Sequence, residues 1–117
     1  MIKKTVTYED FDGNQVTEDL YFNFTKTDLI KMDLQFDGME DKLKKIVAAG
    51  NNKEIYDTFE EIVLKSYGIK DGLKFRKSEE ITRDFKDSLA FDALMMDLLT
   101  TQTNIEDFIK GVIPKVD

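Results

Sequence analysis

The first 24 residues alternate between apolar and polar side chains in two runs separated by a turn sequence. The apolar members of these runs are Ile2, Val6 and Tyr8, and then Val16, Leu20, Phe22 and Phe24. Alternation with a period of two is typical of β-strands that bury one face. Because Asp12-Gly13-Asn14 between the runs has the composition of a tight turn, the sequence predicts an antiparallel hairpin over residues 1–24. Its apolar face has to be covered by the rest of the chain.

From Thr25 onward the apolar residues are spaced by three and four, which is the period of amphipathic helices. Thr25 and Asp28 form a capping pair, and this predicts a short helix that Gly38 ends. A second helix is expected to stop at Gly50. The third helix is the clearest, over residues 51–67, and its apolar stripe consists of Ile55, Tyr56, Phe59, Ile62, Val63 and Tyr67.

Residues 66–78 are predicted to form a corner between the third helix and the next. Gly68 is expected to end the helix in the left-handed conformation, and Asp71-Gly72 to form a tight turn. Ser78 has the position of an N-cap for the helix that follows. The corner therefore sets the angle between two helices.

Within this corner, apolar and basic residues alternate. Leu73 and Phe75 are expected to point into the core. The basic side chains are expected to stay in water, where they pair with acids such as Glu79 and Glu80 or meet the acidic face of a neighbouring subunit; they are Lys70, Lys74, Arg76 and Lys77.

Two further helical regions are predicted after Ser78. The first has Ile81 and Phe85 inward and either stops close to Ser88 or continues through it into residues 89–99, which are apolar nearly all round. The last helix is expected to be capped by Asn104, to cover residues 105–110 and to end at Gly111 and Pro114. Together the elements predict one α+β domain over residues 1–117, with a β-hairpin over residues 1–24 and about five or six helices in a mostly helical part over residues 25–113.

The apolar helix at residues 89–99 is the predicted contact surface for a partner protein. Adjacent Met95 and Met96 point about 100° apart on a helix, so both cannot easily face one core. The predicted contact residues are Phe91, Leu94, Met95, Met96 and Leu99, with Ile105 and Phe108 in support. The alternative is that these residues complete the core. Aspartate at both Met95 and Leu99 is expected to leave the domain folded and to abolish partner binding if they face outward.

Composition excludes several classes of function. The chain has no cysteine and no histidine, so disulfides, cysteine zinc sites and Ser-His or Cys-His nucleophilic pairs are ruled out, and neither an enzyme nor a cofactor is expected. A net charge of −7 argues against binding nucleic acid. No run of apolar residues is long enough to span a membrane. The acidic residues of the hairpin predict either a cation site or, as the alternative, a solvated hairpin end; these residues are Glu9, Asp10, Asp12, Glu18 and Asp19.

In the order and spacing of its motifs the sequence resembles the tail assembly chaperones of long-tailed phages and prophages of Gram-positive hosts. The resemblance covers most of the chain. It rests on residues 10–14 and 22–26 of the hairpin region, on Ser66-Tyr67-Gly68 followed by Asp71-Gly72, and on residues 94–99 and 108–114. Family members often have arginine after the aspartate-glycine pair, whereas this chain has Leu73 and a shorter spacer.

The resemblance implies a non-enzymatic role in the host cytoplasm and absence from the mature virion. Such chaperones bind the long, aggregation-prone tape measure protein, keep it soluble and assist assembly of the tail tube. Further partners implied are the tail tube protein, a frameshifted longer form of the same chain and other copies of it. The alternative considered is a structural tail component, such as a terminator or connector subunit.

Overall fold

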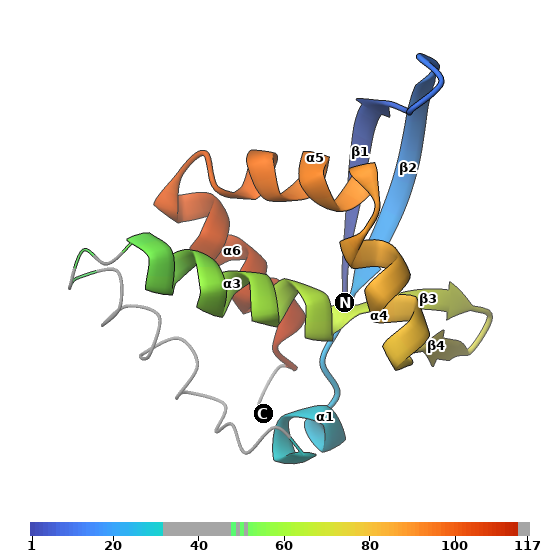
Figure 1. Ribbon diagram of the computed structural model, residues 1–117. Coiled ribbons are helices and arrows are strands. Elements are labelled where there is room, and N and C mark those ends of the chain that lie inside the picture. Colours follow the sequence, from blue (N-terminus) through green and yellow to red (C-terminus); the bar gives the residue numbers. More distant parts are fainter. Residues whose placement is uncertain (32–47, 49, 51, 115–117) are drawn as a thin grey trace.

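The computed structural model describes residues 1–31, 48, 50 and 52–114, in which a four-stranded sheet packs against helices (Figure 1). In chain order the elements are β1 (Ile2–Glu9), β2 (Gln15–Phe22), α1 (Lys26–Lys31), α3 (Asn52–Ser66), β3 (Tyr67–Asp71), β4 (Lys74–Arg76), α4 (Glu79–Lys86), α5 (Leu89–Leu98) and α6 (Gln102–Val112). The α+β class and the N-terminal hairpin are confirmed. The second predicted helix lies outside the described residues.

Strands β1 and β2 form the long hairpin, and Gly13 adopts the positive φ that its turn requires. The pairing runs from Ile2 opposite Phe22 to Glu9 opposite Gln15. One face buries Val6, Leu20 and Phe22 against the helices, as the alternation predicted. The opposite face is polar and carries cross-strand pairs of hydrogen-bonding side chains, so among the described residues this hairpin is packed against helices on one side only.

The corner at residues 66–78 differs from the prediction, because it contains a second hairpin. Gly68 does not end the helix in a left-handed conformation: α3 ends at Ser66, and Gly68 is buried in β3, where a Cβ would lie 2.6 Å from Cε2 of Phe75. The turn at Gly72 is confirmed, with φ of 60°. Leu73 is fully exposed in that turn and Phe75 is only partly buried, so the expectation that both enter the core was wrong for Leu73.

The sheet has the order β1-β2-β3-β4, but it divides in the middle. Strand β3 pairs with β2 only through Tyr21 opposite Gly68 and Phe22 opposite Tyr67. Beyond that point β2 continues alongside β1, and β3 continues alongside β4. Figure 1 shows the two hairpins diverging in different directions from their common base.

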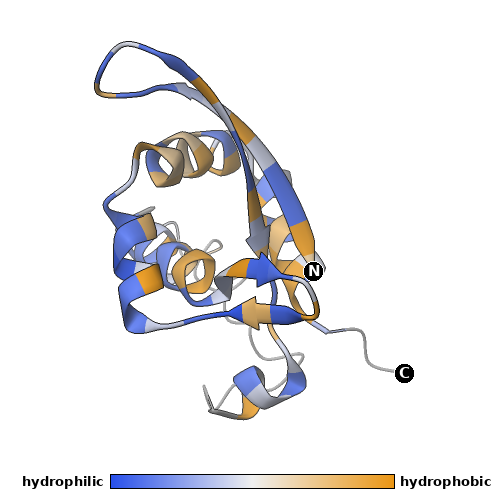
Figure 2. Cartoon of the chain, turned by 90° about the vertical axis from the view of Figure 1, so that its right-hand side faces the viewer, coloured by the Kyte–Doolittle hydropathy of each residue, from blue (hydrophilic) through white to orange (hydrophobic). Residues whose placement is uncertain are grey.

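The core lies between the hairpins and helices α3, α4, α5 and α6. Figure 2 shows apolar segments of the helices turned toward the long hairpin, whose far end is mainly hydrophilic. The buried apolar residues are Val6, Leu20, Phe22, Phe24, Phe59, Ile62, Val63, Phe85, Ala90, Phe91, Leu94, Met95, Leu98, Ile105, Phe108, Ile109 and Val112. Among the described residues no helix is long and apolar enough to cross a membrane.

The starts of α4, α5 and α6 were predicted with different success. Ser78 caps α4, as expected, by accepting a hydrogen bond from Ile81 N–H, and Ser88 caps α5 in the same way, so α4 and α5 are separate helices. The last helix begins earlier than predicted, because Thr101 and not Asn104 is its N-cap: Thr101 Oγ1 accepts from Asn104 N–H. Residue 104 therefore lies in the first turn of α6, which extends to Val112.

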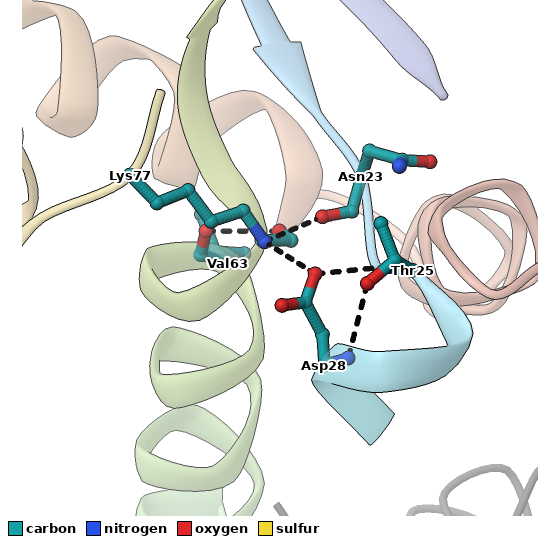
Figure 3. Close-up of polar contacts among 6 residues, drawn as sticks. Asn23, Thr25, Asp28, Val63 and Lys77 are labelled. Carbon is teal, nitrogen blue, oxygen red and sulfur yellow. Dashed lines mark hydrogen bonds and ion pairs between the residues drawn. The ribbon is translucent and has the colours of Figure 1, made fainter. Parts of the chain in front are cut away.

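A partly buried polar cluster joins α1 to the segment before α4 (Figure 3). Thr25 and Asp28 form the predicted capping pair: Thr25 N–H donates to Asp28 Oδ2 at 2.9 Å, and Asp28 N–H donates to Thr25 Oγ1 at 3.0 Å. Lys77 Nζ donates to the carbonyl of Asn23 at 2.7 Å and to Asp28 Oδ2 at 3.2 Å. The basic strip thus pairs differently from the expectation, with Lys77 bound to Asp28, and Arg76 to Asp71 at 2.8 Å.

The negative charge of Asp28 should make the free energy of unfolding depend on pH in the acidic range. Burial alone would raise the pKa of Asp28, but the backbone hydrogen bond from Thr25 and the charge of Lys77 together lower it below the ordinary 3.8. The stabilisation that ionised Asp28 provides is therefore complete above about pH 4, and it is lost as the pH falls through the lower pKa that Asp28 has in the folded state.

We expect Asp28→Asn to lower the free energy of unfolding by about 1 kcal/mol at pH 7 and by much less at pH 2. Urea unfolding at the two pH values measures this. Thr25→Val removes an uncharged partner from the same cluster, and its cost of about 1 kcal/mol should change little with pH. An equal cost of Asp28→Asn at both pH values would contradict the assignment.

Candidate binding cleft

A cleft of about 230 Å³ opens where β2 and β3 diverge. Leu20 and Glu18 line it from β2, and Tyr67 and Ile69 from β3. Helix α4 and the start of α5 close one side, contributing Ile81, Asp84, Phe85, Ser88 and Ala90, and Tyr8 of β1 completes the lining. The cleft therefore exists only because the sheet divides, and its residues come from distant parts of the sequence.

The inner wall of the cleft is aromatic and rigidly packed. The ring of Tyr67 stacks on Phe85 with centroids 3.8 Å apart and planes 11° apart. Phe22 packs against both rings from the core side, with its ring centroid 5.7 Å from that of Tyr67 and 5.9 Å from that of Phe85. Such stacked and tilted pairs stabilise their geometry beyond the area that they bury. The wall is thus preformed.

The rim of the cleft is acidic. Tyr8 Oη donates a hydrogen bond to Glu18 Oε2 at 3.1 Å across the hairpin, and burial together with this hydrogen bond raises the pKa of Tyr8. Burial, aided by the charge of Glu18, also raises the pKa of Tyr67. Asp84 of α4 is a second carboxylate that lines the cleft. An apolar group with a positive charge beside it is therefore the chemistry that this cleft accommodates best.

A second depression lies between α3 and α4 but is less suited to an apolar partner. Its lining is mostly charged, and among the described lining residues Leu64 is the single large apolar one. Several of its charges are already paired: Lys65 Nζ lies 2.6 Å from Glu61 Oε1, and Lys86 Nζ lies 3.8 Å from Glu60 Oε1. A partner would have to displace these pairs.

The acidic hairpin residues serve the hairpin itself. Asp10 Oδ1 accepts the N–H groups of Asp12 and Asn14 in the turn, at 2.9 and 2.8 Å. Glu18 accepts from Tyr8, and Asp19 accepts from Thr5 Oγ1 at 2.7 Å. Within the described part of the chain no group of three or more carboxylates is assembled as a metal site.

The residues predicted to contact a partner are divided by the structure between core and surface. Met95 is 3% exposed and Met96, its neighbour on α5, is 66% exposed, so the two do face opposite ways. Leu99 is partly buried against the core. The other predicted contact residues are enclosed in the chain's own core; they are Phe91, Leu94, Ile105 and Phe108. Of the predicted contact residues, only exposed Met96 on α5 and the partly covered Leu99 at its C-cap are left for an external contact.

Sequence reasoning missed the cleft, although one signal for it was present. Asp71-Gly72 stands between alternating residues, and this dipeptide is a strong indicator of a β-hairpin. Gly68 before it and Ser78 after it have the character of a helix end and a helix start, so the sequence favours a turn between two helices. The position of α4 over the fork had no local signal, since it depends on packing between distant segments.

The described residues thus form a preformed apolar cleft with an acidic rim at the fork between the two hairpins. A family model described as phage tail assembly chaperone matches residues 1–116. The chain belongs to the phage tail assembly chaperone family. Comparison with curated proteins and with solved structures gave no significant match.

Proposed function

We propose that this chain is a non-enzymatic chaperone that binds the tape measure protein in the host cytoplasm, keeps it soluble, assists assembly of the tail tube and is absent from the mature virion. The family match over residues 1–116 is the observation that carries the proposal. Both the tape measure partner and the tube role come from the resemblance to the family.

The surface of the chain supports this role physically. A net charge of −7 favours solubility of a complex with an apolar partner, since like charges keep complexes apart. The cleft at the fork gives apolar side chains of a partner a preformed place to bind. Exposed Met96, which is not among the residues that line the cleft, adds an adaptable apolar contact.

Co-expression with the tape measure protein of the same phage tests the proposal. We expect the tape measure protein to pellet when expressed alone, and to remain soluble and share a size-exclusion peak with this chain when both are present. A tape measure protein that is equally soluble without the chain, or that elutes apart from it, would contradict the proposal.

Mass spectrometry of purified phage particles distinguishes the chaperone from a structural tail component. The chain should be absent, or present far below the copy number of any tail subunit. A stoichiometric amount in the particle would favour a terminator or connector subunit instead.

A further inference from the structure

In the part of the chain that the structure describes, the edge of β2 away from β1 has no neighbouring strand over most of its length. Strand β1 pairs with all of β2, whereas β3 pairs only with Tyr21 and Phe22. Between Gln15 and Leu20 no described strand lies on the side away from β1. An uncovered strand edge presents unpaired N–H and C=O groups that can pair with another chain.

Hydrogen bonds at both ends of β2 show which of its residues direct their backbone N–H and C=O groups away from β1. Beyond its C-terminal end, Asn23 N–H donates to the carbonyl of Ser66 at 2.8 Å, away from β1. Before its N-terminal end, the carbonyl of Asn14 accepts from Asp10 N–H at 2.8 Å, which is on the β1 side. Alternate residues of a strand direct these groups to the same side. Counting in steps of two from Asn14 and from Asn23 leads to the same assignment. Thr17 and Asp19 direct their backbone N–H and C=O groups away from β1, and Glu18 directs its backbone groups toward β1.

The open edge borders the cleft. Leu20 and Glu18, whose side chains point to the helix side of the sheet, line both the edge and the cleft. A strand added beside Thr17 and Asp19 would place every second side chain in the cleft, over Ile81 and the stacked rings, and the others on the polar face. This fits an extended segment with apolar residues at alternate positions.

The negative charges at the rim of the cleft indicate which kind of segment would bind there. Glu18 and Asp84 on the rim, in a chain of net charge −7, favour a segment with lysine or arginine beside its apolar residues. A second copy fits poorly, because antiparallel pairing of two β2 edges across a two-fold axis would bring Glu18 and Asp19 of one copy close to the same residues of the other. Like charges in such positions are destabilising.

We propose that an extended, basic segment of the partner, apolar at every second residue, adds to β2 as an extra strand and fills the cleft. The inference rests on the proposed function, in that the segment belongs to the tape measure protein. It assigns the binding to backbone groups of Thr17 and Asp19 together with the cleft, and not to a helix face.

Amide hydrogen exchange, read by NMR on the chain alone and in its purified complex with the tape measure protein, tests the proposal. The amides of Thr17 and Asp19 should exchange at least tenfold more slowly in the complex. Thr5 and Thr7 provide the internal control, because the same alternation directs their N–H groups to the outer edge of β1, where exchange should be unchanged. Protection of the β1 amides without protection of Thr17 and Asp19 would overturn the proposal.

A pair of variants tests the same edge by binding. Thr17→Pro removes the outward N–H, and edge strands tolerate proline at such positions. Thr17→Val keeps the N–H and, like the proline variant, loses the side-chain hydrogen bond to Thr7. We expect Thr17→Pro to bind at least tenfold more weakly than Thr17→Val. Equal affinities of two folded variants would overturn the proposal, and if Thr17→Pro does not fold, the exchange measurement decides.

The two proposals fail in different ways. Absence of any complex with the wild-type chain would overturn the proposed function and the added strand with it. A stable complex in which Thr17 and Asp19 exchange as fast as in the free chain would overturn the added strand alone.

Discussion

Met95→Asp is expected to leave the chain largely unfolded, whereas Met96→Asp, one residue further along α5, is expected to fold as the wild type does. Met95 is 3% exposed, and a carboxylate there would be buried without a partner. Loss of the apolar side chain and burial of the charge together cost more than about 3 kcal/mol, a large part of the stability of a domain this size. Met96 is 66% exposed, so its replacement should change stability by less than about 0.5 kcal/mol.

Circular dichroism and thermal unfolding of the two variants measure this difference. Near-identical melting temperatures would show that the side chain of Met95 is not enclosed. The result also bears on the sequence-based expectation that aspartate at Met95 and Leu99 leaves the domain folded, because the burial of Met95 predicts the opposite. Met96→Asp is therefore the variant with which to test α5 as a partner contact.

Phe22→Ala is expected to lower the free energy of unfolding by about 3–5 kcal/mol. Phe22 is completely buried and joins the two halves of the sheet, since it pairs with Ile2 in β1 and with Tyr67 in β3. Its ring also packs edge-on against Phe108 of α6, at 5.2 Å between centroids. Truncation would leave a cavity where strands and helices meet, and a rigid aromatic wall cannot easily collapse into it.

Urea unfolding of Phe22→Ala should be compared with that of Phe11→Ala. Phe11, at the tip of the long hairpin, is 87% exposed, so the same chemical change there should alter stability by less than about 0.5 kcal/mol. A loss below about 1 kcal/mol at Phe22 would indicate that the sheet and α6 do not meet at this ring.

Much of the fold could be predicted because local signals are strong. The alternation of residues 1–24 determined the long hairpin and its buried face, and three-and-four spacing identified α3. Capping chemistry located the starts of α1 and α4 at Thr25 and Ser78. At α6 the same chemistry was ambiguous, since both Thr101 and Asn104 are good N-cap residues and only the backbone conformation selects between them.

The functional surface could not be predicted to the same degree. The apolar excess of residues 89–99 is real, but it is absorbed by a core that β1, α4 and α6 build around α5. The buried residues Ala90, Phe91, Leu94, Met95 and Leu98 form one broad arc of about 140° around that helix. The cleft arises from the divergence of β2 and β3, which no single segment encodes. Its residues, such as Tyr8 and Ile81, look unremarkable in the sequence.

The junction between α3 and β3 determines where the chain can change in length. No loop separates them: α3 ends at Ser66, whose hydroxyl donates to the Val63 carbonyl at 3.0 Å and whose own carbonyl accepts from Asn23. One inserted residue would either turn the helix by about 100° relative to the strand or exchange the two faces of β3. In the second case Tyr67 would leave Phe85 for solvent, and Gly68 would lose its place under Phe75. Insertions and deletions can therefore be accommodated at the hairpin tips, where they shift no buried side chain, but not at this joint.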